Sequence, residues 1–265
     1  MKRNLRIFII LLSAFILGCD HSPSLPEGNW RLESIRVLEN DTLVASTQYE
    51  YDADGKLSST QDFDINGERH ETYRYDRFNR ITNIIYLNED DGSISGYDEF
   101  SYKNENINSI DSYNSEEALN DKSSPRDSTK LFYNSNSKLE YIQTDFFNDG
   151  DIDGTTNYFY DSSNKLVSYE YYRGLWEDLT LITNLIYFDD GQLHKITLEN
   201  GPQYKEYIYE SKLVVNIITS FDGENRGRTA HLQWKEEKCK KSESLSQYFL
   251  MYIYLTNISE YCIDI

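Results

Sequence analysis

Aromatic residues alternate with polar ones along much of the chain, and this period of two predicts β-strands. The runs Tyr73-Arg74-Tyr75 and Tyr158-Phe159-Tyr160 show the pattern clearly, because residues i and i+2 lie on one face of a strand. No stretch combines a helical period with capping residues. We therefore expect an all-β fold with little helix.

A tyrosine-centred phrase, approximately Tyr-x-Tyr-Asp-x-x-Gly-Lys-Leu, recurs along the chain. Its second aromatic residue is called the anchor below. The anchors are Tyr51, Tyr75, Tyr102, Tyr133, Tyr160, Tyr187, Tyr209 and, in a weak last copy, Trp234. Such recurrence is typical of an array of similar supersecondary units.

Each copy predicts one β-hairpin. Residues that tolerate a left-handed backbone stand four positions after several anchors, as a type I turn followed by a G1 bulge requires. They are Gly55, Asn79, Asn164 and Gly191. The return strand then starts at a leucine such as Leu166. Tyr169 follows three positions later, so in a regular strand these two side chains would lie on opposite faces. Either a bulge resets the register or both faces of the sheet are partly buried.

Two strands per copy predict an antiparallel meander of about sixteen short strands. An open sheet of that many strands rarely stays flat. We therefore expect the repeated hairpins to form a curved or rolled sheet. An open sheet and a closed barrel remain alternatives at this point.

The first 18 residues predict a signal peptide. Lys2, Arg3 and Arg6 precede an apolar run at 7–17 that is too short to cross a bilayer as a stable helix. The run ends in Ile16-Leu17-Gly18-Cys19, which resembles the lipobox of bacterial lipoproteins. This resemblance implies cleavage before Cys19 and acylation of its thiol. The alternative is an ordinary secretion signal with an incidental cysteine.

Two segments follow the signal peptide. Residues 19–28 carry Pro23 and Pro26 and predict a short tether. Residues 29–265 show no break in composition, so we expect one β-repeat domain. Within this domain the polar stretch at 115–128 predicts a long surface loop.

Acidic residues outnumber basic ones, with 45 Asp and Glu against 26 Lys and Arg and a net charge of −19. Three of the basic residues lie before Cys19, so the chain from Cys19 onward carries 23 of them and a net charge of −22. This excess repels phosphate backbones and anionic headgroups, which argues against nucleic-acid binding. Membrane attachment therefore falls to the lipid on Cys19, at about 0.8 kcal/mol per buried CH₂.

Cys239 and Cys262 remain as a pair once Cys19 carries a lipid. Export places them in an oxidising setting, so a disulfide between them is expected. Two incidental thiols on the C-terminal strands are the alternative.

The repeated phrase resembles the YD repeat of Rhs-type bacterial surface and toxin proteins. The resemblance covers roughly Tyr49 to Leu213, and its later copies decay; Tyr102, for example, reaches Ile107 one residue early. It implies a spiralling β-sheet shell and association with the cell surface. The degenerate repeats also resemble those of small lipoproteins from Bacteroidetes-type bacteria, which implies a lipid-anchored protein of the cell envelope, at the outer membrane.

One loop has the spacing of metal ligands. Asp149, Asp151 and Asp153 stand at positions one, three and five, and Gly154 stands at position six, as a calcium loop requires. Position twelve is Tyr160 rather than an acid, and turn preferences alone explain Asp and Gly here. Calcium binding stays a candidate, and we expect no other cofactor.

The sequence favours a binding or structural module over an enzyme. No nucleophile elbow, phosphate-binding loop or metalloprotease motif occurs in it. Trp30, Trp176 and Tyr172 lie off the repeat positions and form a candidate binding face for a glycan or protein ligand. The anchor tyrosines are expected to pack as cross-strand ladders instead. The alternative function is a hydrolase or accessory protein that acts on glycans through paired carboxylates.

Overall fold

The computed structural model describes residues 29–65, 67–114, 124–175, 178–199, 201–210, 213–220 and 227–237. Cys19, Cys239, Cys262 and Trp176 lie outside these residues, and so does the side chain of Trp30. Lipidation, the disulfide and most of the candidate binding face therefore stay predictions. Among the described residues, no helix is long and apolar enough to cross a membrane.

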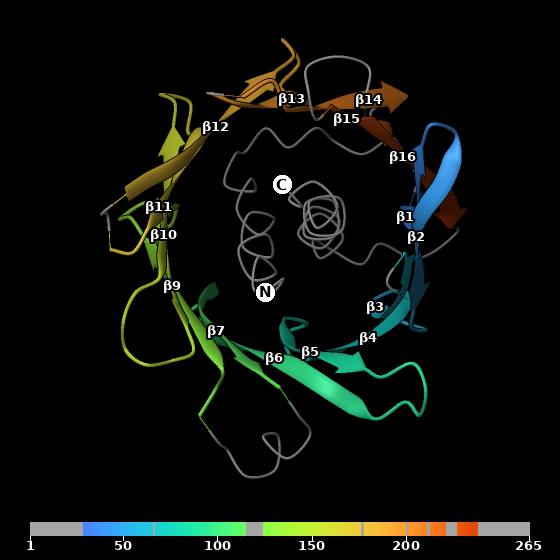
Figure 1. The fold of residues 1–265 in the computed structure, drawn as a ribbon, viewed down its shortest axis with the longest axis horizontal. Helices are drawn as coiled ribbons and strands as arrows, with labels where there is room; N and C mark the ends of the chain where they lie inside the picture. Colours follow the sequence, from blue (N-terminus) through green and yellow to red (C-terminus); the bar gives the residue numbers. More distant parts are fainter. Residues whose placement is uncertain are drawn as a thin grey trace.

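The described residues form a closed antiparallel barrel in which each strand pairs with its neighbours in sequence, as Figure 1 shows. The sixteen strands are β1 (Asn29–Glu39), β2 (Thr42–Tyr51), β3 (Leu57–Asp64), β4 (Gly67–Tyr75), β5 (Ile81–Leu87), β6 (Ile94–Lys103), β7 (Asn106–Tyr113), β8 (Asp127–Tyr133), β9 (Leu139–Phe146), β10 (Gly154–Tyr160), β11 (Leu166–Arg173), β12 (Asp178–Tyr187), β13 (Leu193–Leu198), β14 (Tyr204–Glu210), β15 (Leu213–Ser220) and β16 (Gly227–Glu237). The predicted all-β meander is confirmed, and the sheet closes rather than ending in open edges.

Each copy of the repeat is one hairpin with a register shift at its anchor. In the first copy Glu50 pairs with Ser59 and Tyr51 pairs with Leu57, so one extra residue sits on the return strand. The same shift occurs at Tyr75, Tyr102, Tyr133, Tyr160, Tyr187 and Tyr209. The bulge therefore resets the register, which is the first of the two alternatives that the sequence left open.

The two ends of the described chain complete one more hairpin of the same kind. Trp234 on β16 pairs with Leu32 on β1, and Gln233 pairs with Ser34, which places the extra residue on β1. This is the register of Tyr51 and Leu57 in the first copy. β1 thus serves as the return strand of the last copy, and the barrel closes by repeating its own unit.

The hairpin turns adopt the predicted backbone. Gly55, Asn79, Asn164 and Gly191 have φ values of 84°, 65°, 63° and 89°. In the first turn the Asp52 carboxylate accepts hydrogen bonds from the backbone N–H groups of residues 54 and 56, at 2.9 and 2.8 Å. Asp or Asn directly after the anchor therefore caps the turn.

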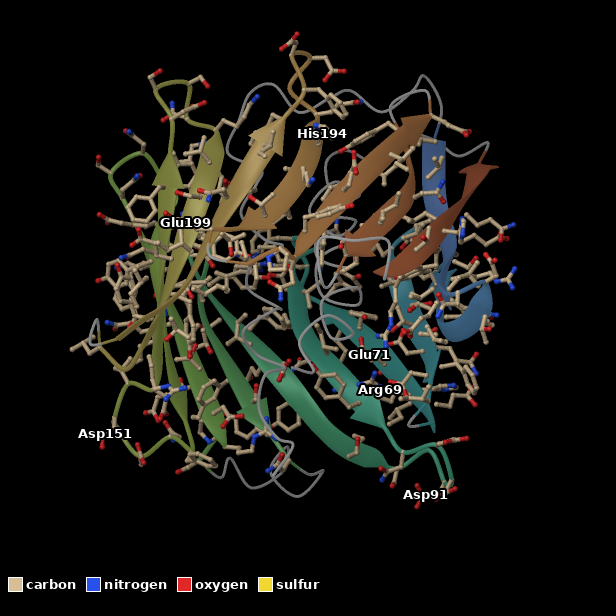
Figure 2. All side chains as sticks on the ribbon, turned by 45° about the horizontal axis from the view of Figure 1, so that its top comes forward. Arg69, Glu71, Asp91, Asp151, His194 and Glu199 are labelled. Carbon is tan, nitrogen blue, oxygen red and sulfur yellow. The ribbon has the colours of Figure 1, made fainter. Side chains whose placement is uncertain are left out.

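The barrel has two rims. The turn rim holds the hairpin turns inside the copies, and the loop rim holds the loops between copies. Figure 2 shows His194 near the turn rim and both Asp91 and Asp151 at the loop rim.

The wall has a buried inner face and an outer face that carries polar and some exposed apolar side chains. Along β2, Thr47 and Tyr49 are buried while Gln48 and Glu50 are exposed, and Phe63 and Ile186 are exposed on other strands. Figure 2 shows Arg69 and Glu71 pointing into the barrel from β4. Near the turn rim the inner face is apolar, with Tyr49, Ile84, Leu131, Tyr158, Leu185 and Ile217 in one core cluster. Nearer the loop rim it carries Thr47, Asp62, Asp98, Asp127, Thr129 and Thr144.

Candidate functional site

We call the contact between the return strand of one copy and the first strand of the next a seam. At each seam the backbone pairing ends before the strands reach the turn rim. At the seam of β9 and β10, for example, the ladder ends at the pair of Tyr141 with Asn157, so Leu139 and Tyr160 lie beyond it. The anchor hydroxyl closes the gap: Tyr160 Oη donates a hydrogen bond to the Leu139 carbonyl at 3.0 Å. All seven tyrosine anchors donate in this way to the preceding copy, at 2.7 to 3.0 Å.

A basic side chain reinforces several seams. The residue before the leucine position places its cation over the next anchor ring, as Lys165 does over Tyr187 at 4.5 Å from the ring centre. Arg31 over Tyr51, Lys56 over Tyr75 and Arg80 over Tyr102 repeat this arrangement. The anchors thus hold neighbouring copies together, which accounts for the tyrosine, the basic residue and the leucine of the repeated phrase.

The seam between β7 and β8 keeps the anchor hydrogen bond, and a groove lies along it on the outer wall. The turn after Tyr102 is shortened so that Lys103 pairs directly with Asn106. Asn106 stands at the position of the basic residue, which Gln192 and Leu213 also replace in two later copies. The strands pair from Ser109 with Lys130 to Ser112 with Asp127, and this ladder ends at the same position relative to the anchor as at the other seams. A cavity of about 580 Å³ lies along this seam.

Aromatic and hydrogen-bonding groups line the groove together. Phe132 and Tyr141 stack on each other, with ring centroids 4.3 Å apart. The polar groups that line it are Lys103, Asn104, Asn106, Asn108, Ser109, Asp111, Ser128, Lys130 and Glu140. A concavity of several hundred Å³ has the size of a small-ligand site, and its lining here is more polar than is usual for one.

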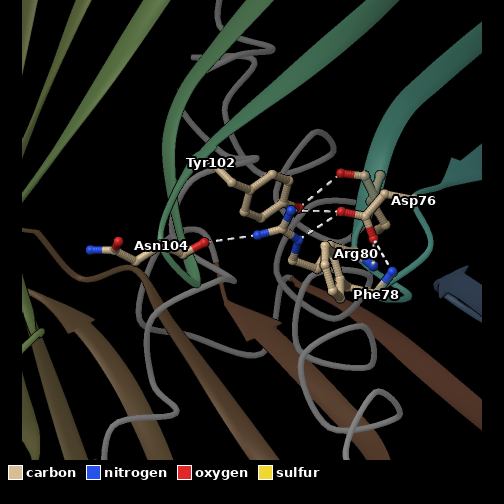
Figure 3. Close-up of polar contacts among 6 residues, drawn as sticks. Asp76, Phe78, Arg80, Tyr102 and Asn104 are labelled. Atoms are coloured by element: carbon tan, nitrogen blue, oxygen red, sulfur yellow. Dashed lines mark hydrogen bonds and ion pairs between the residues drawn. The ribbon is translucent and has the colours of Figure 1, made fainter.

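Arg80 fixes one edge of the groove. Its Nη1 donates to the Asn104 carbonyl at 2.8 Å, and its guanidinium lies 4.3 Å from the centre of the Tyr102 ring. The other side of the guanidinium pairs with the Asp76 carboxylate at 2.7 Å, as Figure 3 shows. This ion pair and the backbone N–H groups of residues 78 and 80 hold the pKa of Asp76 below its usual value against a desolvating surrounding. Arg80, from the preceding copy, therefore holds the shortened turn in place through Asn104 and Tyr102.

The buried polar part of the inner face is internally bonded. Thr47 donates to Asp62 at 2.5 Å, and Arg69 pairs with Asp64 at 2.9 Å. Tyr86 donates to Asp98 at 2.6 Å, while burial raises the pKa of the Asp98 carboxyl. These groups satisfy one another, so this region supplies a structural network rather than a ligand site.

The acids of the calcium motif bond to the backbone. The Asp153 carboxylate accepts from the Phe146 N–H at 2.7 Å, and the Asp149 carboxylate accepts from the Asp151 N–H at 3.0 Å. Burial raises the pKa of Asp153, and the neighbouring acids add to this. In the described ranges, no three His, Cys, Asp or Glu side chains gather as metal ligands. Calcium binding stays a prediction without a preformed site.

Tyr172 is the member of the candidate binding face whose side chain the structure describes. It is half-buried and donates to Glu170 at 2.5 Å on the outer wall. Sequence reasoning missed the groove. The short turn and the missing basic residue at the copy of Tyr102 do not single it out, because both recur at the copy of Tyr209, where Glu210 pairs with Leu213.

No protein-family model and no curated protein matches the chain. Among solved structures, a porin-like protein from Bacteroides uniformis is similar over 77% of this chain and 96% of that chain, with 11% identity and a TM-score of 0.51. At this identity the likeness shows the fold alone. A porin-like protein from Bacteroides vulgatus has 10% identity and a TM-score of 0.40, over 77% of this chain and 98% of that one.

The Tc holotoxin pore of Photorhabdus luminescens is a further neighbour, with 13% identity and a TM-score of 0.33. That likeness covers 69% of this chain but only 13% of the toxin chain. The chain thus spans a small part of the toxin that it matches.

Proposed function

We propose that this chain is a lipid-anchored binding module of the cell envelope, at the outer membrane, and that it binds a neutral glycan in the groove between β7 and β8. The groove itself carries the proposal, because it is a concavity in which a stacked aromatic pair lies beside hydrogen-bonding groups. Aromatic rings pack against the apolar faces of sugars, while amide and hydroxyl groups bond their hydroxyls.

The charge of the chain and of the groove favours a neutral ligand. The chain from Cys19 onward carries a net charge of −22, which repels anionic ligands at long range. Lys103 and Lys130 line the groove together with Asp111 and Glu140, so charges of both signs are present there. A neutral, hydroxyl-rich ligand can use each of these groups as a hydrogen-bond partner.

The polar outer wall supports placing the barrel in water beside the membrane. A membrane-spanning barrel presents an apolar band to lipid, whereas Glu50, Arg74 and Glu99 are exposed on this wall. The lipid on Cys19 would then hold the barrel at the membrane. Cys19→Ala is expected to release the protein from the membrane fraction, as measured by detergent partitioning; unchanged partitioning would contradict the anchor.

Binding is tested with the purified full chain in detergent on immobilised mannan, xylan, laminarin and arabinogalactan. We expect retention on at least one polysaccharide. Phe132→Ala together with Tyr141→Ala should weaken retention by about tenfold or more, because one lost aromatic contact is worth about 1 kcal/mol. The control is Phe63→Ala, which removes an exposed aromatic ring on β3 and leaves the groove intact. Retention on none of the four, or equal retention by all variants, would refute the glycan site.

A glycan hydrolase is the second candidate, because two carboxylates, Asp111 and Glu140, line the same groove. Paired carboxylates are what glycoside hydrolysis needs. Release of reducing sugar from a retained polysaccharide, abolished by Asp111→Asn or Glu140→Gln, would establish this function in place of the binding module. Binding without release, unaffected by isosteric substitution of either acid, supports the module.

A further inference from the structure

Half-buried or exposed apolar side chains form a row on the outer wall, one position before the anchor in four successive copies. The row consists of Phe132 on β8, Phe159 on β10, Ile186 on β12 and Ile208 on β14. Phe159, Ile186 and Ile208 are 41%, 45% and 38% exposed. The same position in the first three copies is polar: Glu50, Arg74 and Ser101. One half of the barrel therefore carries a row that the other half lacks.

Pairing register makes this row continuous with the groove. Phe132 pairs with Tyr141 at the groove, and Tyr141 pairs with Asn157, two residues before Phe159 on the same face. Residues in this diagonal relation are within reach of aromatic side chains. Because Ser168 pairs with both Phe159 and Asn184, the row continues in the same way to Ile186.

The three members of the row beyond Phe132 each pair with a polar residue on the next strand. Phe159 pairs with Ser168, Ile186 with Lys195, and Ile208 with Asn216. The Lys195 ammonium also lies over the Tyr204 ring, 3.6 Å from its centre. From β8 to β14 the row crosses six strand spacings of about 4.8 Å, or about 29 Å in all. The row therefore extends well beyond the groove, whose lining ends at β9.

We propose that this row binds the continuation of a neutral glycan chain whose end or internal segment occupies the groove, so that the ligand is an extended polysaccharide. The proposal rests on the proposed function of the groove. Alternating apolar platforms and hydrogen-bonding groups match a sugar chain, which presents apolar ring faces and hydroxyls in turn. A dry protein interface is matched less well, because the centres of such interfaces are depleted of Lys and Ser.

The test measures affinity against ligand length. Oligosaccharides of graded size are prepared from the polysaccharide that retains the full chain, and their binding is followed by calorimetry. Wild-type protein should bind long oligomers about tenfold or more tightly than the shortest binding oligomer, a difference of about 1.4 kcal/mol. Ile186→Ser with Ile208→Ser should bind long and short oligomers equally. Glu50→Ser with Arg74→Ser, at the same height on the polar half, is the matched control and should keep the length dependence.

The outcomes separate this inference from the groove. If binding of short oligomers depends on Phe132 and Tyr141 but longer oligomers bind no more tightly, the proposal for the row is overturned and the proposal for the groove stands. If no oligomer binds, both fail. If sedimentation shows that the wild-type chain self-associates and the Ile186 and Ile208 double variant does not, the row joins two copies of the chain, and the glycan proposal for it is overturned.

Discussion

A phenol hydroxyl does at each seam what a backbone N–H does elsewhere in the sheet. Where two copies diverge, a carbonyl such as that of Leu139 would be left without its ladder partner, and the anchor hydroxyl of Tyr160 reaches it instead. A buried carbonyl without a partner costs about 1 to 3 kcal/mol. This explains why the repeat retains tyrosine at the anchor, where phenylalanine would fill the same volume.

Removing one anchor hydroxyl should therefore destabilise the barrel. Tyr160→Phe is expected to cost about 1 kcal/mol of unfolding free energy, or about 2 to 4 °C in Tm, measured by thermal unfolding. The control is Tyr172→Phe, whose hydroxyl bonds a carboxylate on the outer wall that water can replace. Equal shifts for the two variants would mean that the anchor hydroxyl plays no special part at the seam.

Asp98 gives the stability of the barrel a pH dependence. Burial raises the pKa of this carboxyl in the folded state above its ordinary value of 3.8. Its contribution is therefore fully present at low pH and is lost as the pH rises through the raised pKa. Asp98→Asn keeps an acceptor for Tyr86 and cannot ionise.

The Asp98→Asn variant should unfold at a higher temperature than wild type at about pH 8, and the difference should shrink toward about pH 4. Thermal unfolding across this range measures it. A difference in Tm that is the same at both ends of the range would show that ionisation of Asp98 is not the cause.

At the level of the element, the hairpin turn depends on backbone conformation more than on charge. Gly191 has a φ of 89°, and a Cβ added there would meet only the Lys165 ammonium, at 3.5 Å. Any loss on substitution therefore reflects the left-handed backbone rather than a clash. Gly55 has a similar φ of 84°, but a Cβ there would also displace the end of the Arg31 side chain.

Gly191→Val and Gly55→Val should each lower Tm, since a β-branched residue in this conformation costs on the order of 1 kcal/mol or more. Asp189→Ala and Asp54→Ala should barely change it, because both acids are exposed turn residues. Differential scanning calorimetry compares the four variants. Losses of equal size in the two sets would contradict the turn assignment.

At the scale of the whole molecule, closure of the barrel depends on the pairing of β1 with β16, two strands that no hairpin turn connects. Leu32 on β1 is fully buried and pairs with Trp234 on β16, as Leu166 pairs with Tyr160 inside one chain segment. The β1–β16 pair has the same bulge as all the other copies. Leu32 therefore becomes part of the core only when β1 pairs with β16.

Leu32→Ala should cost as much stability as Leu166→Ala, about 2 to 5 kcal/mol for each, because both leucines are buried in the same position of the unit. Urea unfolding measures both. A much smaller loss for Leu32→Ala would show that the barrel is open at this pair in solution, and equal losses support closure.

Much of the unit could be predicted from the sequence, because it is encoded locally. The alternation around Tyr158 and Tyr160 gives the strand, and Asn164 gives the left-handed turn position. The parity change between Leu166 and Tyr169 required a bulge or two buried faces, and register at the anchor decided for the bulge. The groove was not predicted, since the side chains that line it come from several strands and meet only in the folded barrel.

By itself the sequence determined the hairpin, its turn and the number of copies, since each depends on residues within one short window whose period and turn chemistry are readable. Only the tertiary structure decided that the sheet closes, that a bulge resets the register, which face lies inside, and where the outer wall is hollowed into a groove. Closure brings together β1 and β16 from opposite ends of the described chain. Small twists summed over many strands, and the contacts between copies, decide such features, and no single window of sequence contains them.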